Sequence, residues 1–288
     1  IEYGIVNLDK PKGPTSHQVS AYVQKILGIS KSGHSGTLDP AVTGILPIAL
    51  GRATRIVQTL LPAGKEYICL MHIHKKTEES LLRKVLDDFI GKIRQLPPIK
   101  SAVKRVERTR EIYYLEILEI REQDILFKVG CQAGTYIRKL CDDIGKKLGC
   151  GAHMAELRRT KAGPFDESTL VTLQELIDAY HYFKEEQNEK FIRKAIQPLE
   201  AGANHLPKAW VFDTTVESLC HGSDLKVPGI GKVNDKINKD DIVAIMTLKN
   251  ELVAIGTAQM NSTEMTGEKG VAVRTEKVFM HPGTYKIS

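Results

Sequence analysis

The sequence predicts an α+β protein in which a larger mixed domain precedes a smaller domain made mainly of short strands. Up to about residue 200, segments with apolar residues at helical spacing alternate with strand-like segments. From residue 206 onward the segments are short, strand-like and separated by turn residues, which is typical of a small barrel. The 288 residues can bury roughly three quarters of the unfolded surface, enough for one large and one small domain.

Three segments in the first third of the chain show clear periodicity. Ser16 is a good N-cap, and apolar residues then recur at helical spacing as far as Gly28, which predicts a helix leading into a loop. Residues 67–73 predict a strand with one wet face, because polar histidines alternate with apolar residues near its end. Apolar pairs along residues 81–90 predict a second helix.

The middle of the chain predicts a strand followed by a helix. Residues 126–131 are typical of a strand and lead through Gly134 into a third helix. The apolar stripe of that helix consists of Ile137, Leu140, Cys141, Ile144 and Leu148. Farther on, Thr172 and Glu175 have the spacing of a capping box and predict the start of a fourth helix.

The C-terminal domain is predicted to hold four strands, at residues 209–212, 242–248, 252–260 and 271–280. A short helix from Asp213 or Thr214 to Gly222 interrupts them, and residues 249–251 predict a tight turn. Evenly spaced short strands of this kind favour a barrel-like domain.

The segment from Gly33 to Gly44 places one carboxylate, Asp39, among turn-forming residues. Glycines permit backbone angles that other residues resist, and Pro40 fixes φ directly after the aspartate. A free aspartate titrates at about pH 4, so Asp39 is expected to be ionised at neutral pH and available as a nucleophile. A loop of this composition is also common as a plain turn, so its residues alone leave both interpretations open.

Arg138 follows Ile137, the first residue of the apolar stripe, and therefore flanks the buried face of the third predicted helix in its first turn. From there its guanidinium can reach a carboxylate on a neighbouring loop. The alternative is an ordinary exposed arginine. Tyr67 has a similar alternative, because a tyrosine on a strand is usually a packing residue.

Composition and charge are consistent with a soluble, intracellular protein. The net charge of +6 makes an anionic partner plausible, because Lys and Arg neutralise phosphates, but many ordinary enzymes are equally basic. The five cysteines are scattered, which argues against a disulfide framework or a zinc site and favours a reducing, cytoplasmic location. No apolar run is long enough to span a membrane, no signal peptide is visible, and a start at Ile1 predicts missing upstream residues.

Motifs along nearly the whole chain resemble those of one enzyme family. The segment GHSGTLDPAVTGILP, residues 33–47, resembles the catalytic motif of pseudouridine synthases of the TruB and dyskerin type, in which the aspartate is the nucleophile. The family's opening segment, tyrosine motif and arginine motifs are also matched. These matches cover residues 7–11, 13–17, 64–67, 133–140 and 151–159.

The resemblance implies an α+β fold with two domains. A large mixed, mainly antiparallel sheet flanked by helices would form the catalytic domain at residues 1–203. A small β-barrel-like PUA domain at residues 206–282 would bind RNA. The implied activity is isomerisation of uridine in RNA to pseudouridine.

The implied mechanism uses three residues. Asp39 would attack the nucleotide at C1′ or C6, and the detached base would turn and reattach through C5. Tyr67 would stack on the base after it leaves the RNA stack, and Arg138 would hold Asp39 by a two-pronged hydrogen bond. No metal or cofactor is implied, and the sequence contains neither a Walker A run nor a dinucleotide-binding glycine motif.

The same resemblance suggests further RNA contacts. His34 is expected near the RNA where the base leaves the stack, Tyr136 in the pocket wall and Lys65 on a phosphate. A basic run is a candidate loop for contacts with the RNA backbone, or else a solvated face. The run consists of Lys100, Lys104, Arg105, Arg108 and Arg110.

Segments 97–105, 110–114 and 151–159 resemble the dyskerin branch, the catalytic subunit of H/ACA guide-RNA particles, and the absence of Lys-rich tails favours an archaeal member. The chain departs from the archaeal pattern at Gly51, at residues 74–80 and at residues 285–288. The implied partners are a guide RNA, an rRNA or tRNA substrate, and zinc-ribbon-like, β-barrel and kink-turn-binding subunits. The alternatives are guide-free action on the tRNA T-loop and a catalytically silent RNA-binding scaffold.

Overall fold

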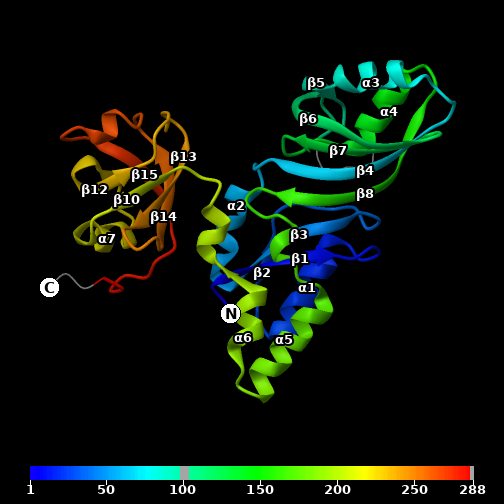
Figure 1. The fold of residues 1–288 in the computed structure, drawn as a ribbon. Coiled ribbons are helices and arrows are strands. Elements are labelled where there is room, and N and C mark those ends of the chain that lie inside the picture. Colours follow the sequence, from blue (N-terminus) through cyan, green and yellow to red (C-terminus); the bar gives the residue numbers. More distant parts are fainter. Residues whose placement is uncertain (98–103, 286–288) are drawn as a thin grey trace. The chain divides into compact units, whose positions relative to one another are not determined.

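The computed structural model describes residues 1–97 and 104–285, which form two compact units (Figure 1). The first unit comprises residue 1 and residues 6–197, and the second comprises residues 2–5 and the chain from residue 198 onward. Each unit has a sheet and a hydrophobic core of its own. In the described residues, no helix has the length and apolar character that crossing a membrane would require.

The first unit is built on a mixed, mainly antiparallel sheet, which confirms the predicted fold class. Its described strands are β1 (Gly4–Lys10), β2 (Ser32–His34), β3 (Thr43–Leu50), β4 (Lys65–Ile73), β5 (Gly91–Gln95), β6 (Arg108–Arg121), β7 (Asp124–Cys131), β8 (Ala152–Ala162) and β9 (Ile196–Pro198). Their order is β5-β6-β7-β4-β8-β3-β1-β9, with β2 paired to β3. Strand β4 runs antiparallel to both β7 and β8, whereas β3 and β8 are parallel.

The helices of the first unit are α1 (Ser16–Leu27), α2 (Val57–Leu60), α3 (Glu79–Asp87), α4 (Ile137–Lys147), α5 (Leu173–Glu185) and α6 (Glu189–Ala195). The capping box predicted at Thr172 and Glu175 is present at the start of α5. The N-cap of α1 is Thr15, not the predicted Ser16, because Ser16 is buried and its hydroxyl contacts the loop after β2. Helix α3 ends before residues 89–90, because Gly91, with a φ of 96°, opens β5.

The helices pack against the sheet in two groups (Figure 1). Helices α3 and α4 cover the part of the sheet that contains β4, β6 and β7, where Phe127 is buried among their apolar side chains. Helices α1, α5 and α6 pack against β1 and β3 in a separate core. The strands β4, β8 and β3 lie side by side between the two groups, and they carry most of the residues discussed below.

The close approach of β3 to β8 requires a glycine at position 44. Gly44 has a φ of 100°, and a Cβ there would lie 2.2 Å from the backbone oxygen of Arg159. We expect Gly44→Ala to destabilise the protein by about 3–5 kcal/mol in denaturant unfolding, because the backbone strain and the clash add.

Gly13→Ala is the matched control for this substitution. Gly13 has a comparable φ of 117°, but a Cβ there would meet nothing within 4 Å. Gly13→Ala should therefore lower the free energy of unfolding only by the cost of backbone strain, about 1–2 kcal/mol. Equal losses at the two glycines would show that the approach of β8 does not constrain position 44.

The second unit contains the predicted short strands in a barrel-like sheet. Its described elements are β10 (Lys208–Val211), α7 (Asp213–Cys220), β11 (Leu225–Lys226), β12 (Ile230–Val233), β13 (Ile242–Thr247), β14 (Leu252–Ala258) and β15 (Val271–Val278). The strand order is β11-β15-β14-β13-β10-β12, in which β10 and β13 are parallel. Asn250, with a φ of 65°, forms the predicted tight turn between β13 and β14. The four predicted strands and the helix are confirmed, whereas β11 and β12 are too short to show a periodic pattern.

Candidate active site

Asp39 lies on a loop between β2 and β3 whose backbone is tied to the start of the chain. The amide of Leu38 donates to the Ser16 hydroxyl at 2.8 Å, and the amide of Gly13 donates to the Pro40 carbonyl at 2.8 Å. Leu38 is buried, whereas Asp39 is exposed. The loop therefore presents an accessible carboxylate on a fixed backbone, as a nucleophile requires.

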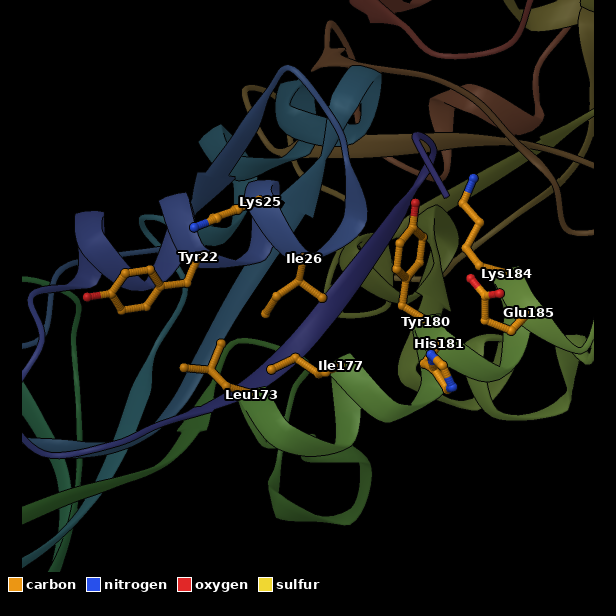
Figure 2. A pocket seen from close by; sticks show the side chains of 9 residues that line it. All are labelled: Tyr22, Lys25, Ile26, Leu173, Ile177, Tyr180, His181, Lys184 and Glu185. Atoms are coloured by element: carbon orange, nitrogen blue, oxygen red, sulfur yellow. The ribbon is translucent and has the colours of Figure 1, made fainter.

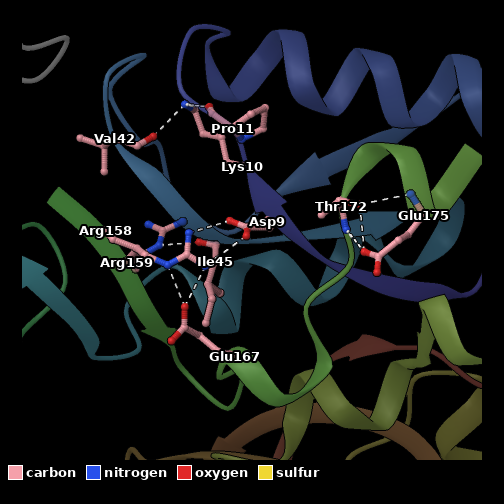
Figure 3. Close-up of polar contacts among 10 residues, drawn as sticks. All are labelled: Asp9, Lys10, Pro11, Val42, Ile45, Arg158, Arg159, Glu167, Thr172 and Glu175. Atoms are coloured by element: carbon pink, nitrogen blue, oxygen red, sulfur yellow. Dashed lines mark hydrogen bonds and ion pairs between the residues drawn. The ribbon is translucent and has the colours of Figure 1, made fainter. Parts of the chain in front are cut away.

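A buried lysine beneath this loop fixes its backbone through hydrogen bonds to carbonyl groups. Lys10 is fully buried, and its ammonium donates to the carbonyls of Pro11 at 2.9 Å, Pro40 at 3.2 Å and Val42 at 2.9 Å (Figure 3). Burial lowers the pKa of Lys10, and the negative charge of Asp39 opposes that decrease. Lys10 belongs to the opening motif, but its place in the sequence indicates no role for it.

Arg138 reaches Asp39 from the first turn of α4. Its Nη2 donates to Oδ2 of Asp39 at 2.6 Å, and both side chains are more than half exposed, at 58% and 55%. The pair is joined by one hydrogen bond, so the predicted two-pronged geometry is wrong. An exposed pair of this kind adds about 0–1 kcal/mol to stability, so its main effect is to orient the carboxylate.

Tyr67 lies on β4, and Arg159 on β8 links it to the Asp39 loop. In the sheet register, Arg159 is opposite Tyr67 on one side and Gly44 on the other. Arg159 is 1% exposed. Its guanidinium donates to the carbonyl of Ile45 at 2.7 Å, to that of Gly36 at 3.4 Å, and to the Tyr67 hydroxyl. Burial raises the pKa of Tyr67, and the charge of Arg159 partly opposes that rise.

Arg159 lies in the matched segment 151–159, but the sequence indicates no role for it. The signal was weak, because arginine is usually exposed and two arginines stand side by side at this point. Strand alternation shows only that Arg158 and Arg159 face opposite sides of the sheet.

His34 and Tyr136 border the elements that carry the ion pair. His34 ends β2 with its ring edge-on to His17, at a centroid distance of 4.9 Å, and neither ring nitrogen has a hydrogen-bond partner in the described residues. Burial lowers the pKa of His34, which favours the neutral ring. Tyr136 is the N-cap of α4, and its backbone is held on both sides by the Gln95 amide. Their contacts with RNA stay predictions.

Lys65 stands where it cannot serve as the predicted phosphate contact. It is 7% exposed, and its ammonium donates to the carbonyls of Leu60 at 2.9 Å, Leu61 at 3.1 Å and Ala63 at 2.6 Å. An ammonium has three protons, so none is left for a phosphate. The structure corrects this expectation: Lys65 closes the turn that follows α2.

The stability of the protein is expected to depend on the ionisation of Lys65. Burial, with a smaller contribution from Arg159, lowers the pKa of Lys65 from 10.5 to about 8. Below pH 8 both the folded and the unfolded chain hold this proton, and the cost of burying the charge is fully present. Between pH 8 and 10.5 the unfolded chain binds more protons than the folded chain, so this group makes stability rise with pH.

Lys65→Met removes this titration. We expect the free energy of unfolding of the wild type, relative to Lys65→Met, to increase by about 3 kcal/mol between about pH 7.5 and pH 10.5. Denaturant titrations of both proteins across this range measure the difference, in which the other titrating groups cancel. A difference that stays constant with pH would contradict the lowered pKa.

The predicted basic run does not form a single loop. Arg108 and Arg110 belong to β6, whereas Lys104 and Arg105 precede it and are exposed. Arg105 borders a hollow of about 780 Å³ whose lining includes charged side chains of α4. Lys100 lies outside the described residues. Two of the five residues, Arg108 and Arg110, therefore lie in a strand and not in the predicted loop. The RNA contacts of the basic run stay predictions.

A groove of about 640 Å³ lies between α1 and α5, away from the residues of the predicted site (Figure 2). Tyr22 and Ile26 of α1 face Leu173, Ile177 and Tyr180 of α5 across it. Within residues 1–97 and 104–285, no three His, Cys, Asp or Glu side chains are placed to hold a metal ion.

An accessible aspartate on a fixed loop is suited to nucleophilic catalysis, and comparison with known families gives the class of enzyme. The chain belongs to the TruB family of pseudouridylate synthases, which isomerise uridine in RNA to pseudouridine. Residues 24–137 match the N-terminal domain of this family, and residues 138–203 match the C-terminal domain of tRNA pseudouridylate synthase B. Residues 207–279 match the PUA domain, and residues 1–20 match the DKCLD domain.

Within the family the chain is close to archaeal Cbf5, which confirms the predicted branch. It is 59% identical over 282 residues to the probable tRNA pseudouridine synthase B of Pyrococcus abyssi, covering 97% of this chain and 84% of the relative. It superposes with a TM-score of 0.96 and 55% identity on a chain in the crystal structure of a Cbf5-Nop10-Gar1 complex, covering 100% of this chain and 88% of that one. It also superposes with a TM-score of 0.93 and 53% identity on a chain in a structure of an H/ACA RNP bound to a substrate RNA containing 2′-deoxyuridine. That match covers 99% of this chain and 88% of the other.

Proposed function

We propose that this pseudouridine synthase is the catalytic subunit of an H/ACA guide-RNA particle and that Asp39 is its nucleophile. The observation that carries the assignment of the site is the 2.6 Å ion pair between Asp39 and Arg138. It joins an accessible carboxylate on a tied-down loop to a guanidinium from a different element, α4. Arg138 holds the carboxylate in place and orients it toward the substrate.

The reaction proceeds on a uridine that has been turned out of the RNA. Tyr67 stacks on the extruded base, which offsets part of the unstacking cost of a few kcal/mol. Asp39 attacks covalently at C1′ or C6, and the N1–C1′ bond breaks. The base turns, a C5–C1′ bond forms and the bond between Asp39 and the nucleotide breaks, which frees the carboxylate. The C5 proton is lost while N1 gains one. Substrate and product contain the same atoms, so the net reaction consumes no second substrate.

The identity of the partners rests on the similar structures. A Cbf5 chain 55% identical to this one was crystallised with Nop10 and Gar1, and another similar structure holds substrate RNA. We assign this chain the same kind of assembly, with a zinc-ribbon-like, a β-barrel and a kink-turn-binding subunit. The guide RNA selects the uridine by base pairing, and the PUA domain holds the ACA end of the guide. The five cysteines are free thiols, which suits the reducing cytoplasm.

A second candidate function is favoured by the names of the curated relatives, which are described as probable tRNA pseudouridine synthases B. In this case the protein itself recognises the T-loop of tRNA and modifies its uridine without a guide. A catalytically silent scaffold is the third possibility, and the intact pair of Asp39 and Arg138 argues against it.

Tritium release from RNA labelled at uridine C5 distinguishes these functions. The isolated protein is assayed on unmodified tRNA, and the protein with its partner subunits is assayed on an RNA target with a matching guide. Release only in the guided assembly supports the H/ACA function, and release from tRNA by the protein alone supports the guide-free one. No tritium release in either reaction would overturn both the H/ACA function and the guide-free function.

A further inference from the structure

Arg159 is a fully buried arginine without an acidic partner. Among the described residues, no carboxylate lies within ion-pair distance of its guanidinium, which donates to two backbone carbonyls and to the Tyr67 hydroxyl. Its neighbour Arg158 is the opposite case. Arg158 is paired with Asp9 at 3.0 Å and with Glu167 at 2.8 Å (Figure 3). The two adjacent arginines therefore differ in whether their charge is compensated.

Two other buried cations accompany Arg159. Lys10 and Lys65 likewise donate to backbone carbonyls, and in the described residues neither has a carboxylate within ion-pair distance. The charge of Arg159 acts on both, because it contributes to the lowered pKa of each lysine, although burial is the larger cause. It contributes in the same way at His34. The buried groups beneath the Asp39 loop thus carry several positive charges, and the charge of Arg159 acts on each of the others.

Such an arrangement costs stability. Burying a charge without an opposite charge is penalised by several kcal/mol, even when hydrogen bonds satisfy its donors. Carbonyl acceptors and a phenol could be satisfied by neutral donors of similar size. The positive charge of Arg159 is therefore without a paired carboxylate among the described residues, and a negative charge that forms during the reaction would compensate it.

The reaction supplies such a charge. When the N1–C1′ bond breaks, its electron pair stays with the base, and the detached uracil carries a negative charge over its ring and carbonyl oxygens. Fixed charges and dipoles aimed at a charge that develops during reaction are the most effective form of catalytic stabilisation. Asp39 is one negative charge near this region, since it acts on Lys10, but its carboxylate is exposed and bonded to Arg138, and in the described part of the chain no carboxylate is paired with Arg159 itself.

Tyr67 provides the connection between the charge of Arg159 and the base. A guanidinium only donates hydrogen bonds, so the Tyr67 oxygen accepts from Arg159 and its own O–H remains available to donate. We propose that Arg159 is a positioning residue of the isomerisation, which acts through Tyr67 to stabilise the negative charge of the detached uracil. The inference rests on the proposed placement of the target base against Tyr67.

The test compares two leaving bases in single-turnover reactions of the assembled, guided enzyme. The substrates are one RNA with uridine and one with 5-fluorouridine at the target, whose ring carries negative charge more easily. We expect Arg159→Gln to slow bond rearrangement of uridine about 100-fold and that of 5-fluorouridine less than about 10-fold. Arg159→Lys retains the charge and should stay within about 10-fold of the wild type on both.

The comparison of substrates within one protein preparation does not depend on how much of the variant is folded. Arg158→Gln, the same substitution at the ion-paired neighbour, is the matched control and should affect both substrates equally. A double-mutant cycle with Tyr67→Phe adds an independent readout. If Arg159 acts through Tyr67, Arg159→Gln should cost less than about 5-fold in the Tyr67→Phe background.

Equal losses on the two substrates, together with additive effects in the cycle, would overturn the inference and reduce Arg159 to an anchor for the loop. Failure of the proposed function looks different. In that case Asp39→Asn retains turnover, or the wild type is inactive in the guided assembly.

Discussion

Asp39→Asn is expected to lower the single-turnover rate of pseudouridine formation by about 10⁴-fold or more, while RNA affinity stays within a few-fold. The amide has nearly the size of the carboxylate, so the loop held by Lys10, Ser16 and Gly13 should keep its shape. It is a very weak nucleophile, however, and cannot form the covalent bond to the nucleotide. Tritium release measures the rate, and filter binding measures the affinity.

Asp9→Asn is the matched control for this substitution. Asp9 is also an aspartate bonded to an arginine, Arg158, through both carboxylate oxygens, at 3.0 and 3.1 Å. It plays no part in the proposed chemistry, so its loss should lower stability slightly and leave turnover within about 10-fold. Retained turnover in Asp39→Asn would refute the nucleophile assignment.

The sequence predicted the elements that carry a long, regular pattern. Strand β4 and helix α4 follow from alternation and from the apolar stripe that begins at Ile137, and both are confirmed. The limits of α3 were predicted less well, because the apolar pairs continue past Asp87 into the turn before β5. Periodicity reports which face is buried, and it does not report where the backbone turns.

The site was predictable only in its accessible part. The residues alone left the roles of Asp39 and Arg138 open, and the family resemblance assigned the pairing that the structure shows. The buried cations Lys10, Lys65 and Arg159 were assigned no role or the wrong one. Lysine and arginine are almost always exposed, so only the tertiary structure, which supplies the carbonyl acceptors, shows that these three are inside.

Arg138→Ala is expected to lower turnover about 10³-fold with little change in RNA affinity or in thermal stability. Without the guanidinium, Asp39 loses the group that orients its carboxylate, and this loss affects the rate rather than RNA binding. Stability should change by less than about 1 kcal/mol, because both side chains of the pair are more than half exposed.

Arg138→Lys tests which property of the arginine matters. A two-pronged bond would make lysine a poor substitute, since an ammonium cannot reproduce the planar fork. The structure shows one N–H···O bond of 2.6 Å, so a single charged donor should be sufficient, and lysine should recover all but about 10-fold of the wild-type rate. A rate for Arg138→Lys as low as that of Arg138→Ala would mean that the fork forms in the RNA complex. A loss of RNA affinity that accounts for the whole defect in Arg138→Ala would instead make Arg138 an RNA-binding residue.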